Sequence, residues 1–523
     1  MKIKTFCTAL LLLPAIAMAG VNTKNGNFYI TYRDFVQESN GHELDINRTY
    51  NSKATEVGWF GFGWGSIFET RMLVMPDGSV VVHEQGAGRE NYYAPEDGSQ
   101  LQAGVDKIAA VVTERDKLDQ EAAAGLRQRL LTNADLRKST VLKYGIQAEL
   151  PEGATAQLSG CSVITRLKNE YQRTTCEGSN FFGGGTDYFD LAGRLIRHEE
   201  GDYKFTIHYA GKYPDRIEDS LGQKVFLVWN TSGHVQMAWP GTGKPVETYS
   251  YDESGNLLIN NEIGGNFYRY KYDTNHNMTQ IGYIDNTHMD MQYDEKSLVT
   301  SVAETDGSKT TYAYRTDPNN PSHYWTTTTS IRPTGEQSSR EEEFVLNTDA
   351  AGVEKLASQS RTVGQRKQDI VWDEQGRVKR VNRPDGSFSE YAYHLKLNKV
   401  SAVATDEGKT EFEYNISGDL IRAKNSQGQL IELDYDGKKH ISRMIETNKT
   451  KRTRRELTFK YNALGKPTKI KLAGKGEINV EYDEQGEISN VESKQGAKMA
   501  LAVTEVFQTL LRVVKVAGVD LGM

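Results

Sequence analysis

Apolar and polar side chains alternate along most of the chain between residues 186 and 493. In one stretch Tyr268, Tyr270 and Tyr272 are separated by Arg269 and Lys271. A period of two is typical of a β-strand with one buried and one solvated face. Asp or Asn, and then Gly, follow many of these stretches, which favours a turn because Asx side chains bond nearby backbone and Gly accepts a positive φ. The pattern predicts a long series of antiparallel hairpins.

An aromatic residue ends each alternating stretch at a nearly fixed interval. The intervals are 20 to 22 residues, except for 58 after Tyr314 and 26 after Tyr435, and the 58-residue gap has room for a degenerate unit near Leu346 and Gly352. Self-similarity at a fixed period indicates a repeat architecture. The repeat aromatics are Phe189, Tyr209, Trp229, Tyr251, Tyr272, Tyr293, Tyr314, Trp372, Tyr393, Tyr414, Tyr435, Tyr461 and Tyr482.

The apolar residues that follow each turn are spaced by three instead of two. Examples are Met278 and Ile281, and Val299 and Val302. This spacing predicts a β-bulge, in which one extra residue stands in one strand of a pair and bends it. One bulge in every unit would curve the sheet, and a long, twisted and curved sheet wraps around itself.

The recurring sequence Tyr-Asp-x-x-Gly-x-Leu resembles the repeat of the YD (RHS) family over residues 186–493. The best matches begin at Tyr251, Trp372, Tyr414 and Tyr482. The resemblance implies repeats that wrap into a hollow β-shell. We therefore expect an all-β fold, built as a spiralling antiparallel β-sheet that forms a YD-repeat shell or a partial barrel.

Residues 20–104 also show alternating stretches and turns, and they are expected to form an N-terminal β module. The segments 44–52 and 58–64 are similar to the module that precedes the repeats in RHS proteins. Both modules of the family are therefore expected, in the usual order.

Three segments break the β pattern. Residues 105–145 have near-helical apolar spacing and predict a short helical insertion of one or two helices, broken near Gly125 or Asn133. Residues 494–523 end the chain with an amphipathic helix. Residues 315–371 lack the repeat register and are expected to hold a protruding loop, where binding residues tend to lie. The apolar stripe of the predicted C-terminal helix is Leu501, Val503, Val506, Phe507, Leu510, Val513 and Val514.

Residues 1–19 have the pattern of a secretory signal peptide, with basic residues, an apolar stretch and a small-x-small site that ends at Ala19. In an exported chain the remaining Cys161 and Cys176 predict a disulfide across a hairpin in residues 146–185, with two buried free thiols as the alternative. We expect a secreted or periplasmic protein. No later stretch is long and apolar enough to span a bilayer.

The sequence shows no pattern typical of catalysis. It has no Gly-x-Ser-x-Gly, His-Glu-x-x-His or Cys-x-x-Cys, and its 10 His residues are scattered. The glycines at 61, 63 and 65 lack the Lys-Ser/Thr of a phosphate loop, and tight backbone packing around Trp59 and Trp64 explains them better. The net charge of −7 argues against nucleic acid as a partner. We predict no catalytic residue, cofactor or metal.

We therefore expect a non-enzymatic scaffold or binding surface for a protein or glycan partner at the cell envelope. Trp239 and Trp325 lie outside the repeat register and are candidate ligand contacts. The alternative is a shell that encapsulates a separately encoded effector or toxin, because some members of the family enclose a C-terminal toxin. The self-cleaving Asp-Pro motif of those members has no counterpart here, since Asp317-Pro318 lies in mid-chain. A hydrolase hidden in the N-terminal region or in residues 315–371 is a third hypothesis.

Overall fold

The structure is a computed structural model. It describes residues 18–39, 42–84, 88–95, 98–159, 162–175, 185–241, 247–262, 265–349, 352–395, 397, 399–463, 465–483, 488–494, 496, 499 and 503. Cys161 and Cys176, residues 1–17 of the predicted leader and most of the predicted C-terminal helix lie outside the described residues.

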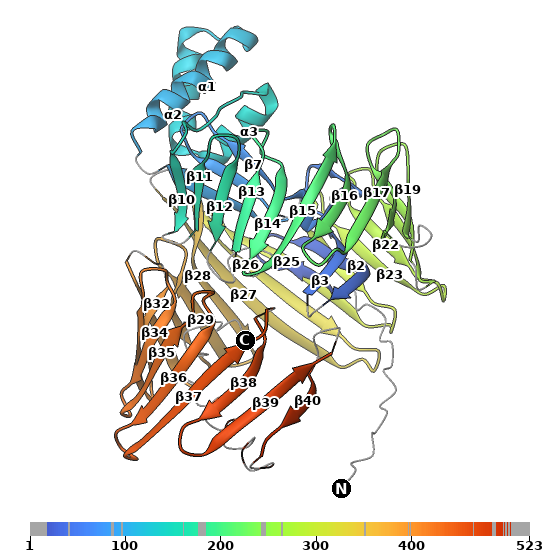
Figure 1. Ribbon diagram of the computed structural model, residues 1–523. Helices are drawn as coiled ribbons and strands as arrows, with labels where there is room; N and C mark the ends of the chain where they lie inside the picture. Colours follow the sequence, from blue (N-terminus) through green and yellow to red (C-terminus); the bar gives the residue numbers. More distant parts are fainter. Residues whose placement is uncertain are drawn as a thin grey trace.

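Within the described residues, thirty-four antiparallel strands form one continuous sheet, here called the shell, in which every strand from β7 to β40 pairs with the next along the chain. Figure 1 shows two curved tiers, green above and orange to red below, joined by long yellow strands. The fold is therefore the spiralling all-β sheet that the sequence predicts.

The strand bounds follow in four groups. The first is β7 (Arg71–Val74), β8 (Val80–His83), β9 (Glu90–Pro95), β10 (Thr155–Ser159), β11 (Ser162–Arg166), β12 (Tyr171–Thr175), β13 (Gly185–Phe189) and β14 (Leu195–Glu200). The second is β15 (Tyr203–Ala210), β16 (Tyr213–Asp219), β17 (Lys224–Trp229), β18 (Val235–Trp239), β19 (Glu247–Tyr251), β20 (Leu257–Asn261), β21 (Phe267–Tyr272), β22 (Met278–Gly282), β23 (His288–Tyr293) and β24 (Val299–Ala303). The third is β25 (Lys309–Asp317), β26 (Asn320–Ile331), β27 (Gln337–Thr348), β28 (Glu354–Val363), β29 (Arg366–Trp372) and β30 (Val378–Asn382). The fourth is β31 (Phe388–Tyr393), β32 (Val400–Thr405), β33 (Gly408–Tyr414), β34 (Leu420–Asn425), β35 (Gln429–Tyr435), β36 (Ile441–Asn448), β37 (Thr453–Tyr461), β38 (Pro467–Leu472), β39 (Gly476–Tyr482) and β40 (Ile488–Glu492).

The first eight strands of the shell close on themselves. A single antiparallel bridge joins Arg71, at the start of β7, to Arg194, just before β14. The backbone N–H of Met72 donates to the carbonyl of Gly193 at 2.8 Å, and that of Leu195 donates to Thr70 at 3.2 Å. The spiral therefore starts from a closed ring, and this closure was not predicted from the sequence.

The turns and bulges explain why the repeat curves. In most units an Asp or Asn after the aromatic caps its own turn; for example, Asp252 accepts the N–H of Asn256 at 2.8 Å. Gly255 there has a φ of 83°. In the next strand pair Tyr272 lies opposite Met278 and Lys271 opposite Gln280, so that one extra residue stands between. The predicted bulge is confirmed at this position.

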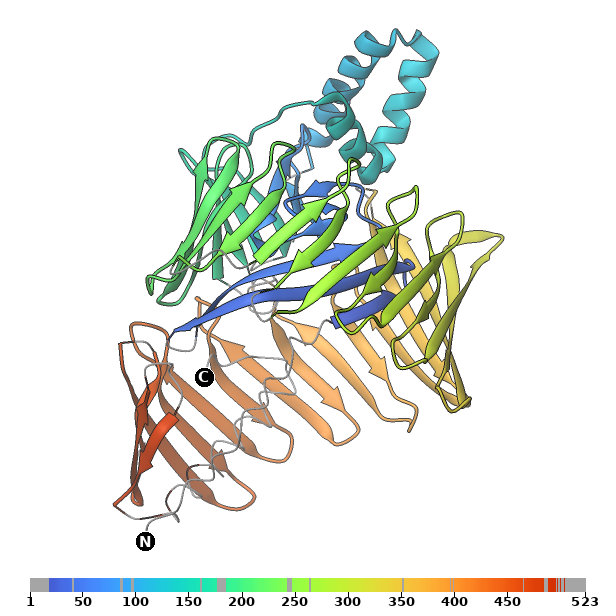
Figure 2. The same cartoon turned by 90° about the vertical axis from the view of Figure 1, so that its right-hand side faces the viewer.

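A second, four-stranded sheet lies inside the shell. It consists of β1 (Met18–Asn22), β2 (Asn27–Ser39), β3 (His42–Asn51) and β6 (Trp64–Gly65), and a ribbon of β4 (Val57–Gly58) and β5 (Gly61–Phe62) accompanies it. We call the described residues between 18 and 65 the plug. Its long blue hairpin crosses the middle of the molecule in Figure 2. Ile30, Phe60 and Trp64 of the plug are fully buried in one core with the upper tier of the shell.

Direct hydrogen bonds tie the plug to the shell wall. The N–H of Val299 donates to Gly26 at 3.1 Å, and that of Phe62 donates to Gly255 at 2.9 Å. A Cβ on Gly61 would lie 2.5 Å from that Gly255 carbonyl, which explains why glycine is needed there. The expectation that the glycines near Trp59 and Trp64 allow close backbone packing is confirmed at this contact.

Three helices leave the shell between β9 and β10, one more than the largest number predicted. They are α1 (Gln100–Asp116), α2 (Gln120–Thr132) and α3 (Ala134–Tyr144). The break expected near Asn133 is confirmed, because Asn133 caps α3 by accepting the N–H of Leu136. The alternative break at Gly125 is wrong, since Gly125 lies inside α2; the first break comes at Lys117, which has a φ of 56°.

The helices project from the upper tier in Figures 1 and 2. They share a core with Met75 and Val81, while Val80 and Val82 point into the plug core. Strand β8 is therefore buried on both faces. The sequence-based division at residue 104 differs from the structure in two ways: α1 begins at Gln100, and β7–β9 belong to the shell sheet.

The expectation of a protruding loop in residues 315–371 is wrong. This segment forms most of β25 to β29, with β26 and β27 twelve residues long each, in unbroken register with their neighbours. The pairing of β27 with β28 does contain a bulge at Leu346, where a degenerate repeat unit was expected.

The lower tier has a separate core. Apolar residues of β32 to β39 form it, and Met499 and Val503, both helical and both 4% exposed, pack into it. The plug contributes no residue to this core among those described. Within the described residues, no helix is both long enough and apolar enough to cross a membrane.

Candidate binding site between the plug and the shell

The repeat aromatics form a ladder along the shell. The hydroxyl of Tyr435 donates to the carbonyl of Leu420 at 2.8 Å, and Leu420 is the first residue after the bulged turn of the preceding unit. The same bond, 14 to 20 residues back along the chain, is made by Tyr209, Tyr251, Tyr272, Tyr293, Tyr314, Tyr393, Tyr414, Tyr461 and Tyr482, and by the indole of Trp229. Burial raises the pKa of one of these phenols, that of Tyr393, to about 12. These aromatics therefore hold one unit to the next.

The two tryptophans predicted as ligand contacts lie apart from each other. Trp239, in β18, stacks on Phe226 with ring centroids 5.3 Å apart. Trp325, in β26, lies under the guanidinium of Arg315 at 3.7 Å and beside His323. Both side chains are half-buried, and the structure does not bring them into one site.

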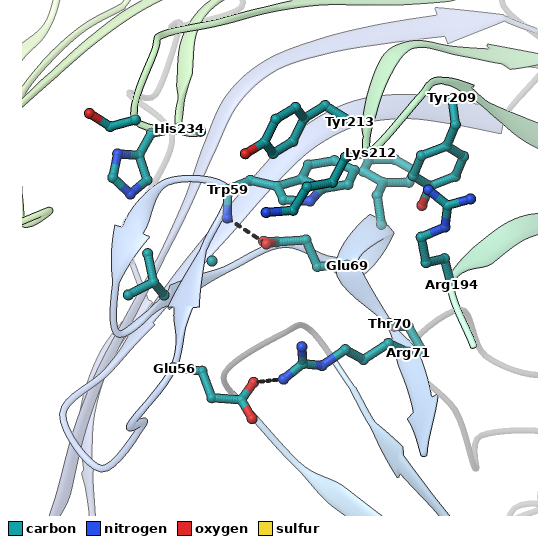
Figure 3. A pocket seen from close by; sticks show the side chains of 15 residues that line it. Glu56, Trp59, Glu69, Thr70, Arg71, Arg194, Tyr209, Lys212, Tyr213 and His234 are labelled. Atoms are coloured by element: carbon teal, nitrogen blue, oxygen red, sulfur yellow. Dashed lines mark hydrogen bonds and ion pairs between the residues drawn. The ribbon is translucent and has the colours of Figure 1, made fainter. Parts of the chain in front are cut away.

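A pocket of about 380 Å³ opens where the plug meets the ring closure and strands β14 to β18. Its lining comes from three separate stretches: the plug ribbon, the short helix η1 (Ile67–Glu69) with the start of β7, and three turns of the shell. We call it the seam pocket, and Figure 3 shows it. It is lined by Glu56, Val57, Gly58, Trp59, Phe68, Glu69, Thr70, Arg71, Arg194, Tyr209, Lys212, Tyr213, Ser232, Gly233 and His234.

The carboxyl group of Glu69 lies within this pocket. Ser66 and Glu69 form a capping box around η1, so the sequence Ser-x-x-Glu already contained a signal for this arrangement. The N–H of Ser66 donates to one carboxyl oxygen at 2.6 Å, and the N–H of Trp59 donates to the other. Burial nevertheless raises the pKa of Glu69 to about 8, against these donors and Arg71. The group therefore carries a proton at neutral pH.

Three cationic side chains surround this neutral carboxyl. Arg71 pairs with Glu56, and Arg194 pairs with Asp190 at 2.7 Å. Arg71 and Arg194 are also the two residues of the bridge that closes the ring. Lys212 is exposed and has no carboxylate partner among the described residues. The pocket is locally basic on a chain whose net charge is −7.

Aromatic rings form the other wall. Trp229 supports two of them, with Trp59 edge-on at 5.6 Å and Tyr213 stacked at 4.6 Å. The hydroxyl of Tyr213 lies over Gly233, where a Cβ would come within 2.2 Å of it. In Figure 3 Tyr213 lies above Trp59, on the side of the pocket opposite Arg71. The rings are thus fixed in place by packing.

The pocket combines aromatic faces with cationic groups, a lining that suits ligand binding. Burial lowers the pKa of the His234 imidazole. Within the described residues, no group of three His, Cys, Asp or Glu side chains is placed to hold a metal ion. Sequence reasoning missed this pocket because its residues are spread over nearly 180 positions and meet only through the ring closure.

Two family models match the chain. Residues 19–93 match a domain of unknown function, DUF6531, and residues 189–346 match the Teneurin YD-shell. These ranges correspond to the plug with β7 to β9, and to the shell from the end of β13 to β27. No curated protein matches the chain significantly.

The solved structures that match the chain include those of Tc toxins. One is the Tc holotoxin pore of Photorhabdus luminescens, with 12% identity over 89% of this chain and 24% of that chain, and a TM-score of 0.36. Another is the TcdB2-TccC3 structure, with 12% identity over 88% of this chain and 28% of that chain, and a TM-score of 0.37. The chain thus spans about a quarter of the length of these solved chains. The Teneurin YD-shell match and the aromatic repeat from Phe189 to Tyr482 identify the chain as an RHS/YD-repeat shell protein.

Proposed function

We propose that the protein is an exported, non-enzymatic shell that serves as a scaffold or binding surface for proteins or glycans at the cell envelope. The observation that carries this proposal is the plug. Residues of the plug pack into the upper tier, so that this part of the interior holds the chain's own core.

The plug is fixed by side-chain contacts as well as by backbone bonds. Arg48 of the plug donates to Asn260 of the wall at 2.7 Å and to the Tyr270 hydroxyl at 3.1 Å. The indole of Trp64 donates to the Tyr272 hydroxyl at 3.0 Å. A rigid, filled shell presents its outer wall and the seam pocket to partners, and surface sites on a rigid scaffold are the usual place for recognition.

The binding role is tested with the full chain on an array of bacterial envelope glycans and by titration against purified envelope components. We expect saturable binding to at least one of them without turnover. A chain that binds nothing on the array and no envelope component, or that converts a component chemically, would contradict the proposal.

The exported state is tested separately by fusing residues 1–25 to a reporter enzyme that is active only outside the cytoplasm. We expect reporter activity, and loss of activity when Leu11 and Leu12 are replaced by Arg. An inactive native fusion would remove the exported role and leave the binding role standing.

An encapsulating shell for a separately encoded effector is the second candidate. It is favoured by the lower tier, whose apolar inner wall receives no residue of the plug among those described. Co-purification with a stoichiometric cargo that is protected from protease would support it. Purification of the shell without any bound cargo, although the effector is co-expressed, would contradict it.

A further inference from the structure

We propose that the seam pocket binds a carboxylated sugar unit. The sugar ring packs against Trp59 and Tyr213, and its carboxylate binds Lys212, beside the Tyr213 ring, and faces Arg71 and Arg194. This inference rests on the proposed binding role and names the ligand class of one site.

The ring closure gives the first argument. Arg71 and Arg194 are paired directly across an antiparallel bridge. Like charges directly opposite one another destabilise a strand pair, so a bridge built from two arginines is costly unless an anion offsets them. Glu56 and Asp190 pair with these two arginines one to one, yet both guanidinium groups remain 39% to 48% exposed and line the same pocket, where each can still donate to a ligand's carboxylate.

Lys212 gives the second argument. Its ammonium group lies 5.2 Å from the centre of the Tyr213 ring and has no carboxylate partner among the described residues. The two side chains are neighbours in the chain, and both line the pocket. A ligand that packs on Tyr213 therefore comes within reach of a cation that has no other anionic partner.

The aromatic wall decides between kinds of carboxylate. Rings with an apolar face and a polar tip suit the CH faces and hydroxyl groups of a sugar. Tyr213 supplies such a face, and the Ser232 hydroxyl lies on the same rim. A volume of about 380 Å³ lies within the range of small-molecule sites, roughly 300–1,000 Å³. A peptide carboxylate would use the cations and leave the rings without a partner.

The protonation of Glu69 removes a charge repulsion that would oppose the binding of an anion. Because burial keeps its proton on at neutral pH, the carboxyl does not repel an incoming anion. In this state it also has a hydrogen to donate to a sugar hydroxyl.

The test is calorimetric titration of the full chain with digalacturonic acid and with its neutral counterpart galactobiose. We expect the acidic sugar to bind more tightly and to weaken as salt is raised from 50 to 500 mM. The Lys212→Gln substitution should lower the affinity for the acidic sugar about tenfold, the loss typical of one charge-assisted hydrogen bond. It should leave the affinity for the neutral sugar unchanged. Lys204→Gln, an exposed lysine of β15 outside the pocket, is the matched control.

Tyr213→Leu tests the aromatic wall and should weaken both sugars, while circular dichroism confirms the fold. Equal affinity of the two sugars, equal losses in the Lys212 and Lys204 variants, or tighter binding of the dipeptide Ala-Ala than of digalacturonic acid would overturn the inference. Envelope binding that survives while digalacturonic acid fails to bind would sink this inference alone. Loss of all envelope binding would instead sink the proposed function.

Discussion

Arg48 and Asp34 form an ion pair in which neither side chain is exposed at all. The guanidinium Nε lies 2.8 Å from one carboxylate oxygen and 2.9 Å from the other. Tyr249 of the shell donates its hydroxyl to the same carboxylate at 2.6 Å. The Arg48 guanidinium also lies over the rings of Tyr32 and Trp64, at 4.4 and 4.8 Å. Groups of both the plug and the shell wall thus compensate the buried ion pair of Arg48 and Asp34.

Replacing one partner of this pair should destabilise the protein strongly. Asp34→Asn leaves the buried guanidinium without its counter-charge, and we expect a loss of about 3–5 kcal/mol in the free energy of unfolding. Urea denaturation followed by circular dichroism measures it. Arg33→Gln is the matched control, because Arg33 pairs with Glu43 and Asp45 at the surface, where ion pairs contribute at most about 1 kcal/mol. Equal losses in the two variants would contradict a buried lock.

The hydroxyl ladder predicts a smaller effect at each rung. Tyr435→Phe removes one donor and leaves the Leu420 carbonyl without it, so we expect a loss of about 1 kcal/mol in stability. Tyr324→Phe is the control, since the Tyr324 hydroxyl bonds to no described residue and its ring stacks on Phe344. Thermal denaturation of both variants decides the point, and a Tyr324→Phe loss as large as that of Tyr435→Phe would speak against the ladder.

Glu69 predicts a pH dependence of stability with a definite sign. Between about pH 4.5 and pH 8 the folded chain keeps the Glu69 proton that the unfolded chain has released. Stability should therefore fall as pH rises through this window and level off above it. The low pKa of Glu90, about 2 because His83 and Lys138 bond its carboxylate, acts only below the window.

The variant Glu69→Gln isolates this contribution, because it carries no titrating group at the same place. We expect a flatter stability profile from pH 5 to pH 8 than in the native chain, measured by urea denaturation at each pH. A native slope that persists unchanged in the variant would assign the dependence to other groups.

Alanine substitutions at two glycines distinguish the cost of backbone strain from the cost of a steric clash. Gly352 and Gly335 have nearly the same φ, 79° and 84°. A Cβ at Gly352 would lie 2.2 Å from the carbonyl of Thr132 in α2, whereas none of the surrounding atoms lies within 4 Å of a Cβ at Gly335. Gly335→Ala should cost about 1–2 kcal/mol from strain alone. Gly352→Ala should cost more, and it should selectively loosen the helices.

Hydrogen exchange measures this difference locally. We expect faster exchange of α2 and α3 amides in Gly352→Ala only, because the N–H of Ala134 bonds to the Gly352 carbonyl. Identical exchange in the two alanine variants would mean that this turn does not anchor the helices.

The parts of the fold that were predicted from sequence are the local ones. The bulge after Met278, the turn at Asp252 and the cap at Asn133 each depend on residues a few positions apart. Strand β26 was missed because its inward-facing residues are polar: Thr326 and Thr328 are buried, so the apolar alternation that marks the other strands is absent. A period of two in polarity cannot be seen when both faces of a strand are threonine.

The parts that were missed depend on contacts between distant segments. The ring closure pairs Arg71 with Arg194 through one bridge, and no local propensity encodes it. The seam pocket depends on that closure and on the plug. Trp59 comes from the plug and Tyr213 from the shell, and the two line one pocket only in the folded chain. The tyrosines were correctly identified as repeat residues, but their bond to the preceding bulge requires the register of three successive strands.

The ladder also limits how such a wall can change in length. Each phenol donates to the carbonyl of the residue that begins the strand after the bulged turn of the preceding unit; Tyr293, for example, bonds Met278, which lies opposite Tyr272. Inserting or removing a single strand would turn the next aromatic to the outside and break the chain of contacts. Growth or shrinkage by duplication is therefore tolerated only in whole pairs of strands, whatever the length of the loops that join them.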